Sequence, residues 1–299
     1  MTHPLTDPQA PIVVGVDGSE CSQMAVDWAV GACLREKRPL RVLSAVGTVP
    51  YAYAPTAMMT ADVVMGAMQA DARRAVDAAV NHVRDLAPDL HVDGRVVGGT
   101  PQLALRHASG EAHKLVVGRR GLGGVRGLLL GSVSADAAAH AECPVVIVGG
   151  PPPTVGPVVV GVDASPISVT AIAHAFAQAD LLQTSVLAVH GIGITNAPLR
   201  GQDDTVVTNL RTEAEEMLGE MLAGFPEDYP DVKIERRVGM GSPAAEIVDA
   251  AATAQLVVVG TRGRGGFRGL LLGSTSRAVA QVAPCPVMVT HTAPAQATT

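Results

Sequence analysis

The sequence predicts an α/β protein made of two tandem domains, each with a five-stranded parallel sheet and helices on both faces. Apolar runs alternate with segments of helical periodicity, as in IVVGVD at 12–17 and KLVVG at 114–118. These runs are apolar throughout, which is typical of parallel strands buried on both faces. The pattern is also written twice, because VVGVDGS at 13–19 returns as VVGVDAS at 159–165.

The composition fits two such domains and excludes several protein classes. The 299 residues suffice for two domains of about 150 residues each. A net charge of −6 argues against a surface for nucleic acid, which needs clustered Lys and Arg. The start MTHPLTDPQAP lacks the pattern of a secretory signal, and no apolar run approaches the roughly 20 residues of a membrane helix. We therefore expect a cytoplasmic protein without membrane or nucleic-acid partners.

The cysteines give no sign of a zinc site, and Cys21 is interpreted as a small semi-buried residue in preference to a redox sensor. Cys21, Cys33, Cys143 and Cys285 form no C-x-x-C pair. The last two open the apolar runs CPVVIV and CPVMVT, so we expect them to be reduced core residues.

The repeat sets the domain boundaries. We expect a first domain at 11–149, a proline-rich linker at 150–156 and a second domain at 157–291. Disorder is expected at 1–10 and at 292–299. In the first domain the predicted strands are 12–17, 40–46, 91–97, 114–118 and 144–148, and in the second they lie near 157–163, 184–190, 232–238, 255–260 and 286–290.

Helices are predicted between the strands. Ser19 is a candidate N-cap for the first helix, and Thr100 followed by Pro101 opens the third. The second helix, at about 60–86, carries an apolar stripe of Met65, Met68, Ala72, Val76, Ala79 and Val83. With the strand order 3-2-1-4-5, strands one and four flank the point where the order reverses, and ligands bind there. Asp17 and Gly118 end these two strands and would face one crevice.

One segment recurs in both domains and is called the glycine phrase here: GRRGLGGVRGLLLGS at 118–132 and GTRGRGGFRGLLLGS at 260–274. Its early glycines let backbone N–H groups approach a ligand. Its Gly-Ser end starts a helix, whose free N–H groups and dipole favour an anion, and the serine hydroxyl either caps that helix or donates to a phosphate. The residues concerned are Gly118, Gly121, Gly131 and Ser132, with Gly260, Gly263, Gly273 and Ser274.

Arginines lie in the same loops and add positive charge for phosphates; they are Arg119, Arg120 and Arg126 in the first copy and Arg262, Arg264 and Arg268 in the second.

Two other phosphate motifs are excluded. A Walker loop needs a Lys-Ser/Thr pair that neither copy has. A dinucleotide fingerprint follows the first strand of its unit, whereas the glycine phrase follows the fourth.

G-x2-G-x9-G-Ser after a fourth strand, together with V-G-V-D-x-S at the first, resembles the ATP-binding branch of the universal stress protein family, in its tandem-domain form known from actinobacteria. The resemblance covers nearly the whole chain. It implies two Rossmann-like (adenine nucleotide alpha hydrolase-like) domains that each bind one adenine nucleotide. His113 and Gln255 depart from an acidic residue common in the family, at the start of the fourth strand and away from the crevice.

The resemblance also implies site residues. The sugar and phosphates would meet the end of the first strand, at Gly15 and Asp17 or at Gly161 and Asp163. The adenine edge would meet backbone at Ala45 and Val46 or at Val189 and His190. The phosphates would meet the glycine phrase, including Thr261.

The leading functional hypothesis is an ATP-binding regulator of stress or dormancy that is not an efficient enzyme, because no Ser–His or Cys–His pair accompanies the aspartates. One alternative is a slow ATPase, with Asp17 and Asp163 as candidate magnesium ligands. Another is a non-catalytic dimeric scaffold. The family pairs domains through their fifth strands, here 144–148 and 286–290, and a homodimer is expected through such edges. The choice among ATP, ADP and cyclic AMP stays open.

Overall fold

The computed structural model of the 299-residue chain describes residues 7, 9–47, 55–122, 129–151, 153–193, 204–263 and 272–291, without the side chains of 55–61 and of residue 204. The chain divides into two compact units, Met1–Val148 and Gly149–Thr299. The ends predicted to be disordered lie outside the described residues, except for positions 7, 9 and 10.

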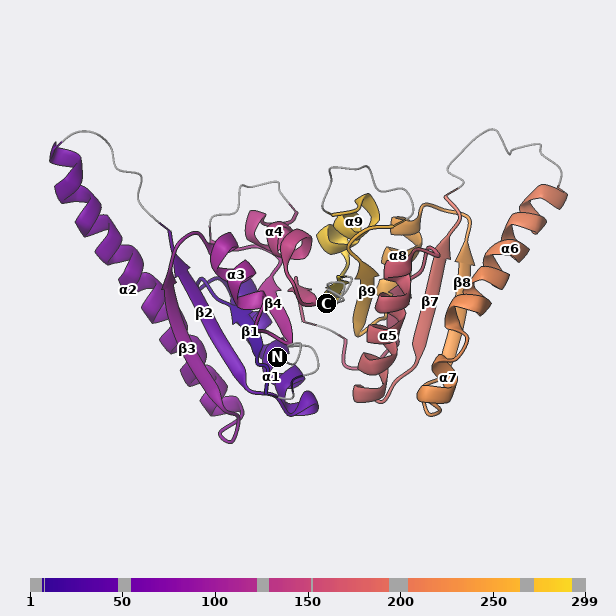
Figure 1. Ribbon diagram of the computed structural model, residues 1–299, viewed down its shortest axis with the longest axis horizontal. Helices are drawn as coiled ribbons and strands as arrows, with labels where there is room; N and C mark the ends of the chain where they lie inside the picture. Colours follow the sequence, from indigo (N-terminus) through magenta and orange to yellow (C-terminus); the bar gives the residue numbers. More distant parts are fainter. Residues whose placement is uncertain are drawn as a thin grey trace, which may run out of the picture. The chain divides into compact units, whose positions relative to one another are not determined.

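Unit 1 contains one parallel sheet of five strands (Figure 1). The strands are β1 (Ile12–Gly15), β2 (Leu40–Val46), β3 (Val92–Gly98), β4 (Lys114–Gly118) and β5 (Val145–Val148). Their order is β3-β2-β1-β4-β5, and Ile12 lies beside Leu40 on one side and Lys114 on the other. The predicted order is confirmed, and it places the reversal between β1 and β4.

Four helices cover the sheet of unit 1: α1 (Glu20–Glu36), α2 (Pro55–Leu86), α3 (Pro101–Ser109) and α4 (Ser132–His140). Helix α1 contacts α2, and α3 contacts α4. Helices α1 and α2 lead from β1 outward to β3, whereas α3 leads from β3 back across to β4 and α4 leads on to β5. Right-handed crossovers therefore place the two pairs on opposite faces.

Strand β1 ends two residues earlier than predicted. Gly18 adopts a φ of +83°, which turns the chain from the strand into α1. Ser19 caps α1 as predicted, because its hydroxyl accepts the N–H of Ser22 at 3.2 Å. This turn leaves Asp17 at the carboxyl edge of the sheet.

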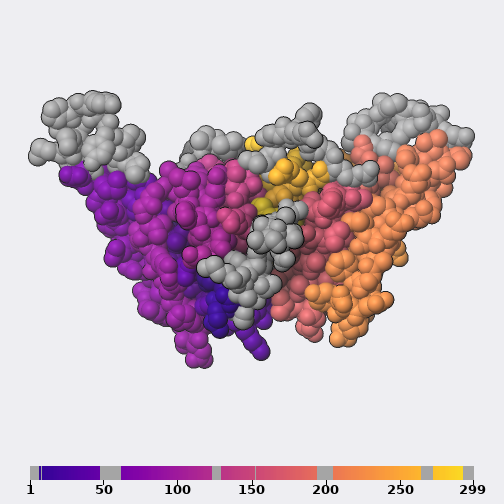
Figure 2. All heavy atoms as spheres, in the orientation of Figure 1, coloured from indigo at the N-terminus to yellow at the C-terminus, as the bar shows by residue number. Residues whose placement is uncertain are grey.

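Unit 2 repeats the architecture in the order β8-β7-β6-β9-β10. Its strands are β6 (Val158–Gly161), β7 (Val186–Gly191), β8 (Ile234–Gly239), β9 (Leu256–Gly260) and β10 (Val287–Thr290). Its helices are α5 (Pro166–Leu181), α6 (Asp204–Leu222), α7 (Phe225–Asp228), α8 (Pro243–Ala251) and α9 (Ser274–Val282). Figure 2 shows α6, in orange, at the surface of this unit. Among the described helices, none has the length and apolarity that a bilayer crossing needs.

The short helix α7 was not predicted. It follows α6 directly and places Phe225 on Phe176 of α5, with ring centroids 5.1 Å apart. Tyr229, just after α7, lies 5.7 Å from the same ring. Three of the few aromatic residues therefore gather in one cluster, and this long-range contact stabilises a turn that has no helical periodicity of its own.

The apolar stripe of α2 is buried along only part of its length. Ala72, Val76, Ala79 and Val83 are at most 9% exposed. Met68 is 38% exposed, because the N-terminal part of α2 extends beyond the sheet (Figure 1). The prediction that the two methionines belong to the core stripe is therefore wrong for Met68.

A buried ion pair lies at the amino end of β4 in unit 1. The Nζ of Lys114 contacts Oε1 of Glu36 at 2.5 Å, and the side chains are 3% and 6% exposed. The Nε2 of His113 lies 3.1 Å from the other oxygen of Glu36, and the ring of Trp28 lies 5.8 Å from Nζ. In unit 2 the equivalent positions hold Leu182 and Leu256, so the fold itself does not need the pair.

Candidate functional site

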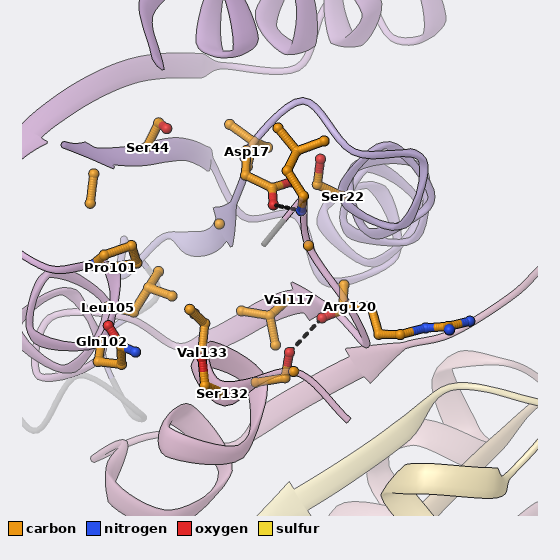
Figure 3. A pocket seen from close by; sticks show the side chains of 18 of the residues that line it. Asp17, Ser22, Ser44, Pro101, Gln102, Leu105, Val117, Arg120, Ser132 and Val133 are labelled. Carbon is orange, nitrogen blue, oxygen red and sulfur yellow. Dashed lines mark hydrogen bonds between the residues drawn. The ribbon is translucent and has the colours of Figure 1, made fainter. Parts of the chain in front are cut away.

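A cavity of about 650 Å³ opens at the carboxyl edge of the sheet in unit 1 (Figure 3). Its wall is formed by the ends of β1, β2 and β4, by the first turns of α3 and α4, by Ser22 of α1 and Met68 of α2, and by Gly121 and Leu122 of the glycine phrase. Its volume lies within the roughly 300–1,000 Å³ of small-molecule sites. The cavity occupies the reversal point at which the sequence predicts a ligand.

Asp17 stands at the cavity wall with an exposed side chain. Its Oδ1 accepts the N–H of Ser19 at 3.0 Å and its Oδ2 accepts the N–H of Leu122 at 2.9 Å. Burial acts to raise the pKa of Asp17, but the hydrogen bonds from Ser19, Leu122 and Ser22 outweigh it and lower this pKa below its ordinary value. The carboxylate is therefore ionised at neutral pH, and it fastens the glycine phrase to the end of β1.

Gly121 and Gly263 each lie close to an aspartate. A Cβ at Gly121 would collide with the carboxylate of Asp17, and a Cβ at Gly263 would collide with that of Asp163. These glycines therefore let the backbone approach the aspartate. Their predicted approach to a ligand stays a prediction.

Gly118 and Gly260 also permit a close approach within the protein. A Cβ at Gly118 would lie 2.7 Å from the carbonyl carbon of Cys21, in the first turn of α1. A Cβ at Gly260 would lie 2.8 Å from the side chain of Ile167, in the first turn of α5. These glycines thus bring the first helix of each unit against the fourth strand, beside Asp17 or Asp163.

The N-terminus of α4 forms a further part of the wall. Gly131 is its N-cap residue and supplies no side-chain cap, and Ser132, Val133 and Ser134 line the cavity. Ser132 is exposed and stands inside the helix, so the alternative that it caps α4 is wrong. The first N–H groups of a helix lack intrahelical acceptors, and here they lie at the cavity wall, where an anion can accept from them.

Of the two described arginines in the glycine phrase of unit 1, only Arg120 lines the cavity. The guanidinium of Arg120 points away from the other labelled side chains in Figure 3. The backbone of Arg119 holds the start of the glycine phrase in place. Its N–H donates to the carbonyl of Val148 at 2.7 Å, and its carbonyl accepts the N–H of Gly131 at 2.9 Å. Arg126, Arg264 and Arg268 lie outside the described residues.

The adenine contacts expected at the second strand need a correction of register. Parallel pairing places Gly15 beside Leu43 and Gly161 beside Val189. Val189 and His190 are therefore equivalent to Leu43 and Ser44, so the expectation that set them against Ala45 and Val46 is wrong by two residues. Neighbouring apolar strands offer no internal mark of register, and the sequence alone did not reveal the slip.

In unit 1 the cavity wall includes Leu43, Ser44 and Ala45 from the end of β2. Val46, which we also expected, is buried and does not line the described cavity. Of the other residues expected in unit 1, Gly15, Asp17, Gly118, Arg120, Gly121, Gly131 and Ser132 line it.

Unit 2 brings its predicted residues together in the same way. Oδ1 of Asp163 accepts the N–H of Ser165 at 3.1 Å and the hydroxyl of Ser168 at 2.7 Å. The N–H of Gly273 donates to the carbonyl of Thr261 at 2.7 Å, which repeats the closure between Gly131 and Arg119. The side chain of Thr261 is buried, whereas Arg262, Gly263 and Ser274 are exposed.

Sequence reasoning missed several residues of the site. Ser134 donates its hydroxyl to the carbonyl of Gly118 at 2.7 Å, and Ser276 donates to that of Gly260. The segment GSVS recurs as GSTS, and this recurrence was the sequence signal for the two serines. Pro101 and Gln102 line the cavity from α3, and the recurrence of GTP as GSP marked that turn.

The universal stress protein family matches the chain twice, over residues 10–149 and 154–291. The chain belongs to the universal stress protein family. A universal stress protein of Mycobacterium tuberculosis is 38% identical over 291 residues, covering 94% of this chain and 97% of its own. One of Mycolicibacterium smegmatis is 36% identical over 291 residues, covering 93% and 96%.

Solved structures share the fold. A universal stress protein of Archaeoglobus fulgidus has a TM-score of 0.66 at 19% identity, covering 95% of this chain and 97% of its own. A universal stress protein solved in complex with cAMP is 30% identical and covers 48% of this chain and 98% of its own, with a TM-score of 0.35. The tandem α/β architecture is thus that of the family.

The described side chains of this universal stress protein can be assessed as magnesium ligands. The described residues contain no cluster of three His, Cys, Asp or Glu side chains that would hold a metal alone. Mg²⁺ needs only one or two carboxylates when phosphates complete its shell. Asp17, ionised and exposed at the cavity wall, fits that arrangement, and Mg²⁺ would neutralise the repulsion between its charge and a polyphosphate.

Proposed function

We propose that this universal stress protein binds one adenine nucleotide in each unit and serves as a nucleotide-dependent regulator of stress or dormancy. The observation that carries the proposal is the cavity of unit 1. It joins an apolar wall from β2, β4 and α3 to the uncapped N-terminus of α4 and to an ionised aspartate. An adenine base suits the apolar wall, and a phosphate chain suits the helix terminus.

A regulator, and not an efficient hydrolase, is favoured by the titratable groups at the cavity. Among the described residues of its wall, Asp17 is the one titratable carboxylate, and Arg120 carries the other charge. A hydrolase needs a base within hydrogen-bond reach of the attacking water, and Asp17 already accepts two backbone N–H groups. Bound nucleotide would therefore persist long enough to report its cellular level.

The direct test is mass spectrometry of small molecules released from the denatured protein, followed by calorimetry with ATP, ADP and cAMP. Adenine nucleotide in the released fraction, or binding of at least one of the three ligands, is expected. If nothing is released and none of the ligands gives a binding isotherm, the proposal fails.

Two substitutions at Ser132 isolate the phosphate contact. Ser132→Asp places a negative charge at the first position of α4, which stabilises the helix but repels a phosphate. Ser132→Asn is the neutral control of similar size. We expect the Asp variant to lose detectable ATP binding in unit 1 without a loss of stability, and the Asn variant to bind nearly as the wild type does.

The exposure of Asp17 also favours a second candidate, a slow magnesium-dependent ATPase. Asp17→Asn removes the charge but keeps the size of the side chain. Under this alternative the variant keeps part of its ATP binding and loses Mg²⁺-dependent phosphate release. Equal release by the variant and the wild type would dismiss it.

We also propose that two chains form a homodimer through the edges of their fifth strands. Sedimentation equilibrium at micromolar concentration is expected to give twice the mass of the chain. A mass of one chain would remove the dimer and leave the nucleotide sites unaffected.

A further inference from the structure

The imidazole of His190 lies across the carboxyl edge of the sheet in unit 2. His190 is in β7, and its Nδ1 lies 2.7 Å from the carbonyl oxygen of Val162, just beyond the end of β6. A carbonyl oxygen only accepts, so Nδ1 carries the proton and donates. The side chain thus bridges the ends of two neighbouring strands.

The same bridge is not made in unit 1. The register places Ser44 at the position of His190 and Val16 at that of Val162. Both Ser44 and Val16 line the cavity of unit 1. The imidazole of unit 2 therefore spans a place that, in unit 1, is part of an open cavity wall.

A second difference lies on the facing helix. Gln102, in the first turn of α3, lines the cavity and offers a carboxamide with donors and an acceptor. Its equivalent in α8 is Ala244, because Thr100–Pro101 aligns with Ser242–Pro243. At these two positions unit 1 thus has Ser44 and Gln102, whereas unit 2 has His190 and Ala244.

We propose that the two nucleotide sites are unequal and that His190 is the residue that weakens base binding in unit 2. This inference rests on the proposed function and goes beyond it. A base that enters unit 2 as proposed for unit 1 must displace the imidazole from the Val162 carbonyl. Losing that hydrogen bond lowers the affinity by about tenfold relative to unit 1.

The test measures each site separately in the full chain. Ser132→Asp leaves only the site of unit 2, and the matched Ser274→Asp leaves only that of unit 1. Calorimetry with ATP is expected to give a dissociation constant about tenfold higher for the first variant than for the second.

Reciprocal exchanges assign the difference to one side chain. Adding His190→Ser to the Ser132→Asp chain is expected to tighten binding in unit 2 by about tenfold. Adding Ser44→His to the Ser274→Asp chain is expected to weaken binding in unit 1 to a similar extent. Circular dichroism of each variant checks that it is folded.

The outcomes separate the two proposals. If no variant and no wild-type protein binds ATP, ADP or cAMP, the proposed function itself fails. If both units bind equally, or if unit 2 binds more tightly, the function stands and the inequality is overturned. If the units differ but His190→Ser does not tighten unit 2, the role of His190 is overturned.

Discussion

Removing one partner of the Glu36–Lys114 pair should destabilise unit 1 far more than removing both. The charges are 2.5 Å apart with side chains 6% and 3% exposed, so Lys114→Leu leaves the buried carboxylate of Glu36 without the lysine charge. Losing one member of a buried pair costs about 3–5 kcal/mol. In the E36L/K114L double variant no charge is stranded, and two leucines gain apolar burial of about 2 kcal/mol each. We therefore expect the double variant to match or exceed the wild type.

The chain provides both the precedent and the probe. Leu182 and Leu256 occupy the equivalent positions of unit 2, so the fold accommodates the two leucines. Trp28, the single tryptophan, lies in α1 of unit 1, where its ring faces Lys114. Urea unfolding followed by tryptophan fluorescence therefore reports the free energy of unfolding of unit 1 alone.

The reasoning is refuted if the double variant loses as much stability as Lys114→Leu, because stranded charge would then not be the cause. It is equally refuted if Lys114→Leu loses less than about 1 kcal/mol, since water would then be solvating Glu36. His113 also contacts Glu36, so the triple variant E36L/H113Q/K114L, which copies Gln255 of unit 2 as well, is the control for a lost histidine partner.

Three further predictions concern titration, packing and thiol chemistry. Burial acts to raise the pKa of Glu36, but His113 and Lys114 outweigh it and lower this pKa from 4.5 to about 2. The stability it supplies is complete above pH 5 and is lost as the pH falls towards 2. Fluorescence-detected unfolding should thus lose roughly 3 kcal/mol more over that range than in E36L/K114L, and an equal loss would contradict the assignment. Gly118→Ala should destabilise unit 1 by about 1–3 kcal/mol because its Cβ meets backbone, whereas Gly66→Ala, with open space around it, should be neutral or stabilising; equal effects would contradict the packing argument. Burial raises the pKa of the Cys33 and Cys143 thiols to about 12, and Cys285 is buried as well. A thiol reagent at pH 8 should therefore label Cys21 alone in the native protein, and labelling of two or more thiols would refute this.

Most of the fold was predictable because local signals agree with the tertiary structure. The strands at 40–46 and 114–118 have the predicted bounds, since turn residues flank each apolar run. Ser19 and Thr100 cap their helices as predicted. Caps and turns depend on neighbouring residues, which the sequence displays directly.

What was missed depends on residues far apart in the chain. Glu36 and Lys114 are 78 positions apart, and Lys114 alone looks like the first residue of an apolar strand. The equivalence of Ser44 and His190 follows from strand register, which the two aligned repeats did not fix at that point. Gly121 also leaves room for the carboxylate of Asp17, and no pattern around Gly121 in the sequence indicates that close approach.

A backbone hydrogen bond of 2.9 Å from the N–H of Gly131 to the carbonyl of Arg119 joins the two ends of the glycine phrase. In unit 2 a bond of 2.7 Å from the N–H of Gly273 to the carbonyl of Thr261 does the same. A peptide inserted between two ends that are joined in this way need not strain the sheet, because the entropic cost of closing a loop rises only slowly with its length. A reporter peptide grafted between Leu122 and Leu129 in one copy, with the other copy left native, would turn a single polypeptide into a sensor that carries its own reference.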